Sequence, residues 1–505
     1  MLLVAVLLVL TWMLWRLYRF TLIPLLRPQE VKELPYWIPF LGHAISLYRD
    51  IDGTITHGRE YFGNTRATFS ITVAGQKIYI MTSALNISAA LNNLRDFDNA
   101  KPKIFLMRRF GISKEAIGVL YENPSALPHM ISKPSPKSLA AISESLIHRQ
   151  LTPGPCYEAF ESVFLQAIQQ RVSPGAIPPE AVVPSAETKP GMQAMSLSEF
   201  VRQTFVKSNM LAFFGPALQE INPQFGNQFL HFDDKIQTLL KKLPSPWPSA
   251  AEVAMEKPIW SLKVYLELPE EERIGQSWVV SSLEAELRSK GIGTEDIAKW
   301  LFMLFWGSNT TTWRLAFWVS AHLLYDPSLM MEIRREIATA TENHTSFSSL
   351  HKQLSRCTRL MAVYHEVLRF VDSVISIRES TCPQLSALGE QLPAGGTVML
   401  THRQLLMDEE VWGPDAKAFN AERFLHRDDL TKSKSFTPFG GGALLCPGRF
   451  MARGEVLCFV AFLLDRFDIE TTQPFPRLDT RSNAGSGILG IKEGDDAVLL
   501  VRQRI

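Results

Sequence analysis

The segment from Phe436 to Glu455 places one cysteine in a glycine-rich loop ahead of a helical pattern. It reads FTPFGGGALLCPGRFMARGE, with Cys446 behind three glycines and Pro447 at the position of a first helical residue. Glycine lets the backbone adopt positive φ and approach a flat ligand closely, and proline at that helical position needs no amide donor. The exposed amides of a helix N-terminus favour a thiolate. The loop could therefore present a thiolate to a metal, or bury a small apolar side chain.

This loop resembles the haem-binding signature of the cytochrome P-450 family. The matching pattern is Phe439-x-x-Gly442-x-x-x-Cys446-x-Gly448. The resemblance implies that the Cys446 thiolate is the axial ligand of a haem b iron, and that Phe439, Gly442 and Gly448 help to bind the haem. A thiolate ligand pushes electron density onto iron and favours cleavage of the O–O bond, which explains why the ligand is a cysteine.

Two further segments follow the order that this family uses. Glu366 and Arg369 in YHEVLRF lie one helical turn apart, so they can pair with each other and with a third residue. The similarity of FNAERF to the family's meander motif implies that the third residue is Arg423. Between them, Arg378 resembles the strand arginine that reaches a haem propionate, where a planar guanidinium matches a carboxylate.

Two positions depart from the family pattern. Two residues before the cysteine the family usually has Arg or His, whereas this chain has Leu444, so one propionate contact is left open. The usual Trp-x-x-x-Arg of an early helix is missing. Either His148 or Arg149 in LIHRQL could substitute for it, or both could lie at the surface.

A long apolar run from Ile297 to Leu324 carries a polar cluster at 307–312, GSNTTT. Lys299, Arg314 and this cluster would all need partners in hydrocarbon, where polar groups are costly. The run therefore predicts a long central core helix with a polar notch and not a second membrane span.

The resemblance places the family's oxygen-activating acid and alcohol in this notch. One register takes Asn309 and Thr310. The other follows from the similarity of Trp306–Trp318 to the sterol 7-hydroxylase and prostacyclin synthase branch, takes Thr311 and Thr312, and is the one we favour. Neither register supplies a carboxylate, so proton delivery would run through hydroxyls and ordered water.

Residues 1–27 are predicted to form a membrane anchor. Met1 to Trp15 is an unbroken apolar run, and Phe20 to Leu26 continues it past two arginines that can reach the headgroups. Three arginines follow the run before the first acid, Glu30, so the positive-inside rule places the rest of the chain in the cytoplasm. We therefore expect a single-pass anchor in the endoplasmic reticulum membrane with a cytosolic catalytic domain.

The rest of the chain, residues 28–505, is predicted to be one catalytic domain. Residues 65–82 read as a two-stranded hairpin, and the Pro-rich segment 173–194 as a flexible surface insertion. The resemblance implies a mainly helical fold with small sheets and a long central helix over the haem. Lys and Arg number 52 against 51 Asp and Glu, and this balance gives no basic field for nucleic acid.

The resemblance predicts a monooxygenase that oxidises a hydrophobic small molecule, such as a steroid, a terpenoid or another secondary metabolite. Electrons would come from NADPH through NADPH-cytochrome P-450 reductase, with cytochrome b5 as a possible second donor. Arg449 and Arg453 follow the cysteine and would help to dock the acidic reductase, or lie on a generic solvated helix face. The Pro-rich insertion and the overall resemblance suit a fungal natural-product enzyme. Two alternatives are a haem-thiolate isomerase or dehydratase that needs neither dioxygen nor reductase, and a non-enzymatic membrane haem protein.

Overall fold

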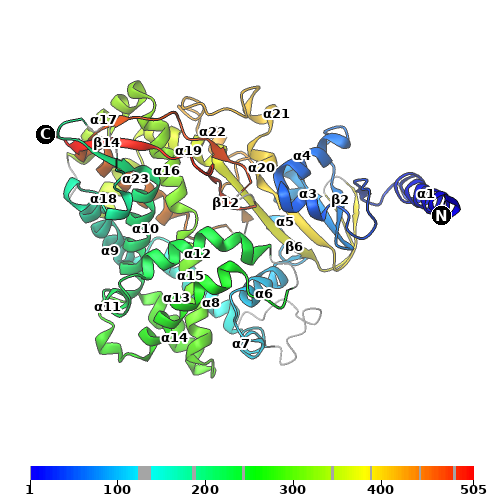
Figure 1. The fold of residues 1–505 in the computed structure, drawn as a ribbon, viewed down its shortest axis with the longest axis horizontal. Helices are drawn as coiled ribbons and strands as arrows, with labels where there is room; N and C mark the ends of the chain where they lie inside the picture. Colours follow the sequence, from blue (N-terminus) through cyan, green and yellow to red (C-terminus); the bar gives the residue numbers. More distant parts are fainter. Residues whose placement is uncertain are drawn as a thin grey trace.

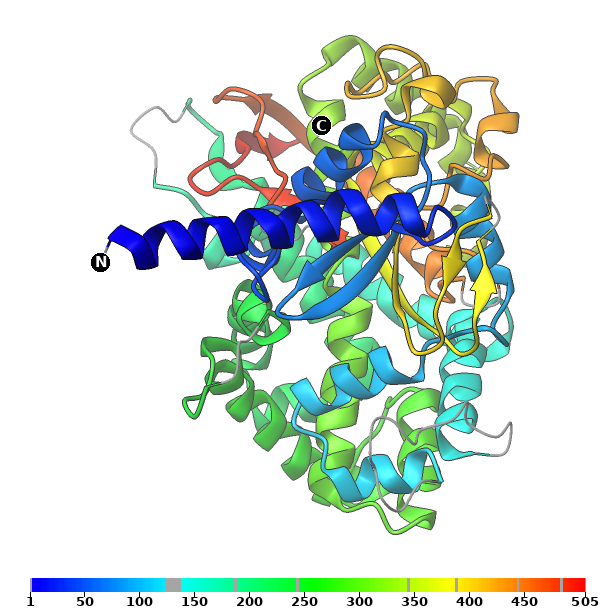
Figure 2. The same ribbon diagram turned by 90° about the vertical axis from the view of Figure 1, so that its right-hand side faces the viewer.

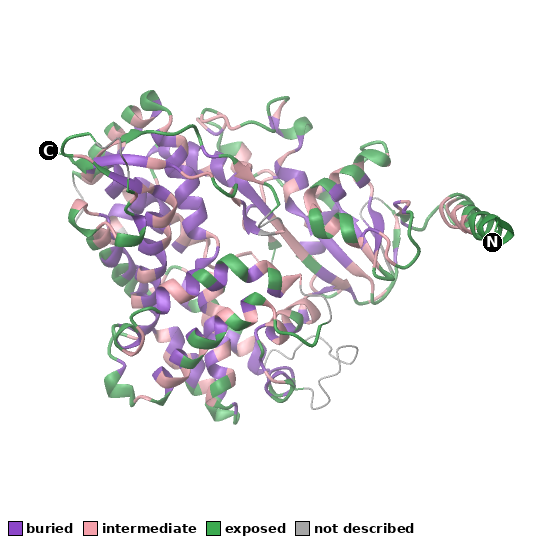
Figure 3. Ribbon diagram, viewed as in Figure 1, coloured by how far each residue is buried: buried purple, intermediate pink, exposed green. Residues whose placement is uncertain are grey.

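The computed structural model describes residues 2–122, 138–184, 189–241, 245–342, 346–386, 389–442, 445–481 and 485–504. Most helices gather in one part of the molecule, and the largest sheet lies at the other end, next to the N-terminal helix (Figure 1). Buried residues are concentrated among the helices and on the sheet (Figure 3). This arrangement is the mainly helical fold with small sheets that the sequence predicts.

The N-terminal helix lies at the sheet end of the molecule in Figure 1, and Figure 2 shows it crossing in front of the body with its N-terminal end projecting to the left. It consists of α1 (Leu2–Leu17), a π-helical turn (Tyr18–Leu22) and α2 (Ile23–Leu26). Among the described residues it is the one helix that is long and apolar enough to cross a membrane, and none of that window is buried. The Trp12 ring stacks on Trp37 with centroids 5.5 Å apart, so the base of the helix contacts the body.

The largest sheet has the strand order β1-β2-β3-β9-β6-β12, and β4 pairs with β6 beside this path. Its predicted hairpin is confirmed as β2 and β3, joined by Ala74 and Gly75 at φ 48° and 81°, values that a primed hairpin turn requires. The strand bounds are β1 (Lys32–Glu33), β2 (Phe69–Val73), β3 (Gln76–Met81), β4 (Phe97–Asp98), β6 (Asp372–Ser380), β9 (Thr397–Thr401) and β12 (Ser486–Ile488).

Three smaller sheets complete the β-structure. They are β10 (Phe467–Thr471) with β14 (Val498–Gln503) and β5 (Gln193–Ser196), β11 (Leu478–Asp479) with β13 (Gly490–Ile491), and β7 (Gln384–Leu385) with β8 (Gln391–Leu392). In the predicted insertion at 173–194, the described part has two 3-10 turns, and Ala181 is buried. Residues 185–188 of that insertion lie outside the described residues.

The predicted central helix is present, but it is broken in the polar notch. It forms α15 (Thr294–Asn309) and α16 (Thr312–Leu324), with Thr310 and Thr311 between them. Every residue of α16 except His322 is buried, so the apolar run is core and not a second membrane span. The interruption falls where the Thr310 hydroxyl donates to Asp233 and the Arg314 guanidinium donates to the Thr310 carbonyl.

The remaining helices pack around this core. Their bounds are α3 (Ala44–Arg49), α4 (Ile51–Tyr61), α5 (Ala84–Asn92), α6 (Ala100–Arg109), α7 (Lys114–Leu120), α8 (Leu139–Leu151), α9 (Pro155–Arg171), α10 (Leu197–Phe214), α11 (Ala217–Ile221), α12 (Phe225–Leu240), α13 (Ala250–Glu267), α14 (Trp278–Ser289), α17 (Pro327–Thr341), α18 (Phe347–Leu354), α19 (Thr358–Val371), α20 (His402–Leu406), α21 (Glu409–Trp412), α22 (Asp428–Thr431) and α23 (Arg449–Arg466).

Candidate active site

A cavity of about 580 Å³ lies between the break in the central helix and the cysteine loop. Its walls come from α15, α16, β6, β12 and the start of α23. Cys446 and the three notch threonines line it, and apolar side chains such as Leu304, Leu315 and Ile488 make up much of the rest. The fold thus brings the predicted thiolate and the predicted hydroxyls to one cavity.

Backbone bonds hold the cysteine loop in a tight turn. The Cys446 amide donates to the Phe439 carbonyl over 3.0 Å, and the Arg449 guanidinium donates to the Cys446 carbonyl over 2.8 Å. Burial raises the pKa of the Cys446 thiol, while the amides of Gly448 and Arg449 and the Arg449 charge act to lower that pKa. The helix N-terminus therefore favours the thiolate, as predicted. In the protein without a ligand, however, the effect of burial on the thiol pKa is larger.

Two loop glycines are required by the backbone. Gly440 and Gly442 have φ of 74° and 61°, a region that glycine adopts without strain. A Cβ at Gly442 would overlap the carbonyl of Leu91 on α5. A Cβ at Gly448 would lie 3.7 Å from the Cys446 sulfur, so at that position glycine leaves the space beside the sulfur open.

Arg378 is buried close to this cavity on β6. It lies two residues beyond Ser376, which lines the cavity, and therefore on the same face of the strand. Its Nη1 donates to the Ile377 carbonyl over 2.8 Å, while its buried Nε has no hydrogen-bond partner among the described residues. Burial lowers the pKa of Arg378, and Asp98 acts against that shift. An unsatisfied buried donor beside the cavity fits an anionic ligand group such as a haem propionate.

His402 links β6 to the cysteine loop, and no motif in the sequence points to it. Its Nε2 lies 3.1 Å from the Ser376 hydroxyl and its Nδ1 lies 2.8 Å from the Thr437 hydroxyl. Burial, together with the nearby Arg378 charge, lowers the pKa of His402 to about 4. The ring is therefore neutral at pH 7 and acts as a structural tie.

The positions proposed to replace the missing early motif do not face the cavity. His148 and Arg149 are exposed, and the Arg149 guanidinium lies over the Trp278 ring at 4.7 Å. Instead, Ile147 and Leu151 of α8 line the cavity. Leu444 lies outside the described residues.

Two indoles that sequence reasoning missed also line the cavity. The Nε1 atoms of Trp300 and Trp306 are buried without a hydrogen-bond partner among the described residues. Buried indole nitrogens usually find an acceptor, so these two donors fit a site whose ligand supplies one. Nothing in the local sequence distinguishes them from ordinary core tryptophans.

The predicted Glu-Arg-Arg cluster forms between α19 and the segment that follows α21. Glu366 accepts from Arg369 over 2.7 Å and 2.8 Å and from Arg423 over 3.1 Å. Arg369 also donates to the carbonyls of Leu406, Ala416 and Ala418. The cluster therefore ties α19 to the segment that leads to the cysteine loop, as expected for a structural role.

The three notch threonines line the same wall with different partners. Thr310 donates its hydroxyl to Asp233 of α12, whereas Thr311 lies against Gly487 of β12. Asn309 turns away from the cavity and donates to the Phe305 carbonyl over 2.8 Å. Asp372 of β6 lines the wall as well, and burial raises its pKa well above the ordinary value.

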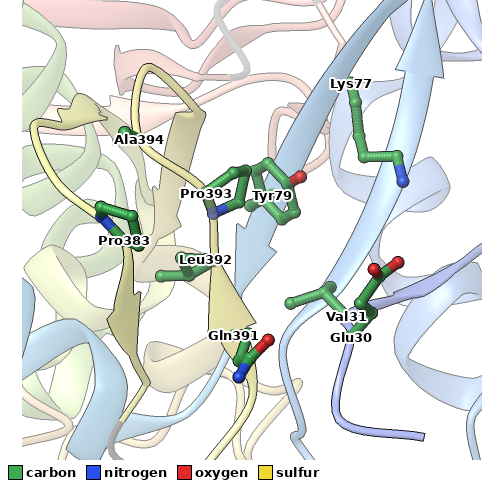
Figure 4. A pocket seen from close by; sticks show the side chains of 9 residues that line it. All are labelled: Glu30, Val31, Lys77, Tyr79, Pro383, Gln391, Leu392, Pro393 and Ala394. Carbon is green, nitrogen blue, oxygen red and sulfur yellow. The ribbon is translucent and has the colours of Figure 1, made fainter. Parts of the chain in front are cut away.

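A second hollow, of about 700 Å³, lies at the sheet end of the molecule (Figure 4). Glu30, Lys77, Tyr79 and Gln391 are among the side chains around it. It shares no lining residue with the cavity at Cys446 and contains neither cysteine nor histidine. The Cys446 cavity is therefore the candidate active site.

A family model for cytochrome P-450 matches residues 200–493 of this chain. The matched range covers more than half of the chain and includes the broken helix, the Glu-Arg-Arg cluster and the cysteine loop. The chain belongs to the cytochrome P-450 family. Family membership makes it an oxidoreductase and implies a haem-thiolate cofactor, which the cavity, the sulfur and the unsatisfied donors fit.

Several P-450 relatives match most of the chain. The cytochrome P-450 monooxygenase efuG of Hormonema carpetanum is 24% identical over 90% of this chain and 87% of its own length. The cytochrome P-450 monooxygenase calL of Penicillium decumbens is 25% identical over 78% and 77%. An indoleacetaldoxime dehydratase of Arabidopsis thaliana is 32% identical, but over only 34% of this chain and 35% of its own length. These matches include fungal P-450 enzymes, while the sterol 7-hydroxylase branch stays a prediction.

Proposed function

We propose that this P-450 is a monooxygenase that inserts one oxygen atom into an apolar secondary metabolite, a steroid or a terpenoid. Cys446 would ligate the haem iron, and Phe439, Gly442, Gly448 and Arg378 would hold the porphyrin and a propionate. When bound, haem supplies the dioxygen chemistry that protein side chains cannot perform. The observation that carries the proposal is that Cys446 and three threonines face one largely apolar cavity.

The chain's own residues would bind the substrate and supply protons. The side chains of Leu304, Leu315 and Ile488 give an apolar wall that excludes water and favours a hydrophobic substrate. The notch hydroxyls offer groups that can hold or pass a proton. Electrons would come from NADPH through a membrane reductase that docks near Arg449 and Arg453, with the chain anchored by residues 1–27 in the endoplasmic reticulum.

The ligation is tested by the carbon monoxide difference spectrum of the reduced protein. We expect the wild type to show a thiolate-type Soret band and Cys446→Ser to lose that band. Cys382→Ser is a matched control, because Cys382 is also half-buried but lies outside the cavity. A wild-type spectrum typical of histidine ligation would refute the proposal.

A second candidate reaction is dehydration or isomerisation without dioxygen or reductase. It is favoured by the notch, which contains no carboxylate of its own, and by the similarity to an indoleacetaldoxime dehydratase. To separate the two, terpenoids and steroids are first screened for a substrate-induced spin shift. Those that bind are then incubated with and without NADPH and a reductase. Product that forms without NADPH would exclude the monooxygenase.

A further inference from the structure

Asp233 is a buried carboxylate from α12 that touches a hydroxyl of the active-site wall. Its Oδ1 accepts the Thr310 hydroxyl over 2.7 Å, and its Oδ2 accepts the Arg314 guanidinium over 2.9 Å. The Asp233 side chain is fully shielded from solvent and that of Arg314 nearly so. Thr310 in turn lines the cavity that contains Cys446. Asp233 therefore reaches the cavity through one side chain.

Arg314 fixes this arrangement at the break in the central helix. It donates to the Thr310 carbonyl, which in an unbroken helix would accept from the amide of residue 314. Its Nη1 also lies 3.3 Å from the Thr310 hydroxyl oxygen. The Thr310 hydroxyl therefore lies between Arg314, which donates to it, and Asp233, which accepts from it. These two residues set the orientation of the hydroxyl.

The network continues from the cavity toward solvent. The Trp313 ring has the Arg314 guanidinium 4.3 Å from its centroid and the Arg202 guanidinium of α10 at 5.3 Å. Arg202 pairs with Asp234, at 2.8 Å, whose side chain is 47% exposed. Charged groups therefore extend from the half-exposed Asp234 to the cavity wall.

Aromatic contacts also dock α12 on the central helix. Phe229 and Phe232, which precede Asp233, pack on Phe305 and Phe302 of α15 with ring centroids 4.8 Å and 4.9 Å apart. These aromatic contacts already bury the face of α12. A buried ion pair is often no more stabilising than apolar residues of the same volume, so its presence at this point suggests a role beyond packing.

We propose that Asp233 supplies, from α12, the carboxylate that the polar notch lacks. It is a positioning residue that acts through Thr310, and this inference rests on the proposed oxygenase function. As drawn, the Thr310 hydroxyl donates to Oδ1 of Asp233. When a proton from solvent reaches the carboxylate, Oδ1–H donates to the Thr310 oxygen and the hydroxyl proton turns to the cavity. The hydroxyl proton then moves to an acceptor in the cavity, and the carboxyl proton moves to the Thr310 oxygen. Thr310 is again a hydroxyl and Asp233 again a carboxylate, and one proton has been delivered to the cavity.

The test compares Asp233→Asn and Thr310→Val with a matched control in the full-length, haem-loaded protein. The control is Glu284→Gln, which removes one charge from a similarly buried pair with Arg273, away from the cavity. The first measurement is the infrared C–O stretching band of the reduced protein with carbon monoxide bound. The second is NADPH consumption with a fungal reductase and no added substrate. Melting temperatures report the structural cost of each variant.

We expect Asp233→Asn and Thr310→Val to shift the C–O band, because the first reorients the Thr310 hydroxyl dipole and the second removes it. Asp233→Asn should also slow NADPH consumption by roughly 100-fold, the lower range for loss of proton transfer. Glu284→Gln should lower only the melting temperature. This control separates a positioning role from a purely structural one.

A haem-loaded Asp233→Asn with the wild-type band and the wild-type NADPH consumption rate would overturn the inference. If Asp233→Asn does not load haem, Thr310→Val decides, since it removes no buried charge, and a wild-type band in that variant would also overturn it. A wild type without a thiolate-type carbon monoxide spectrum would instead remove the proposed function. The two failures are therefore distinguishable.

Discussion

At the residue scale, the site depends on a few buried polar groups whose partners lie in the cavity or in the cysteine loop. Arg378 has a buried Nε without a partner among the described residues, and His402 is held between two hydroxyls. Burying such groups costs free energy unless they are bonded. Their placement is therefore informative about what the cavity binds.

Replacing Arg378 with leucine should weaken haem binding. A hydrogen bond to a charged group contributes about 1.5–3 kcal/mol, so we expect haem affinity to fall roughly 10- to 100-fold. Arg378→Lys should recover only part of it, because lysine lacks the planar fork. Haem content per polypeptide measures the effect, with Arg427→Leu as control, since Arg427 is exposed and pairs only locally with Asp429. Equal haem content in all variants would contradict this role.

His402 should make the protein less stable as the pH falls. Burial lowers the pKa of His402 to about 4. Between about pH 6.5 and pH 4, His402 is therefore protonated in the unfolded chain but neutral in the folded chain. The contribution of His402 to the free energy of unfolding is fully present above about pH 6.5 and decreases as the pH drops toward 4. At about pH 5 the loss is about 2 kcal/mol.

The measurement is the melting temperature of wild type and His402→Gln at several pH values. The variant loses its two hydroxyl contacts and should be less stable at neutral pH. Its deficit should shrink as the pH falls, because glutamine does not titrate. A deficit that is independent of pH would show that His402 is not kept neutral.

At the element scale, ionic contacts join α19 to the segment that leads to the cysteine loop. Glu366 on α19 binds Arg369 and Arg423, and Arg423 also binds Asp415. The cluster fixes the long segment between α21 and α23, which contains little regular structure. Its loss should therefore loosen the loop that carries Cys446.

We expect Glu366→Gln to destabilise the protein by about 3–5 kcal/mol, because it leaves buried guanidinium charges unpaired. Glu422→Gln is the matched control. Glu422 pairs with Arg359, but its side chain is 60% exposed, so its loss should cost less than about 1 kcal/mol. Melting temperature and haem-loaded yield distinguish the two. If both variants lose the same stability, the buried cluster contributes no more than an exposed ion pair.

At the scale of the whole molecule, the N-terminal helix and the body are linked by aromatic contacts and by an ion pair between Arg19 and Glu33. Trp12 stacks on Trp37 and donates its Nε1 to the Trp37 carbonyl over 2.8 Å, and Arg16 lies 4.8 Å from the same ring. No residue of the helix is buried, although the side chains that contact the body are half-buried (Figure 3). The catalytic body does not depend on it for its core.

Deleting residues 1–27 should separate membrane attachment from haem binding. The truncated protein should move from the membrane pellet to the soluble fraction, because the one membrane-length helix among the described residues is gone. Its carbon monoxide spectrum should stay thiolate-type. If the truncated protein still sediments with membranes in high salt, another surface anchors it.

The sequence by itself determined the cysteine loop, the Glu-Arg-Arg residues, the β2–β3 hairpin and the fold class. These features are local or belong to motifs with fixed spacing, so the order of residues along the chain is sufficient to recognise them. The positions of Phe439, Gly442 and Gly448 around Cys446 follow from the same spacing.

Only the tertiary structure decided which side chains meet across helices. It turned Asn309 toward its own helix and Arg149 onto Trp278, and it brought Asp233 to Thr310 from 77 residues away. Such contacts depend on how each helix is rotated and where the central helix breaks. Hydrophobic periodicity assigns the buried face of a helix, but it does not identify the polar partner that a neighbouring helix places against that face.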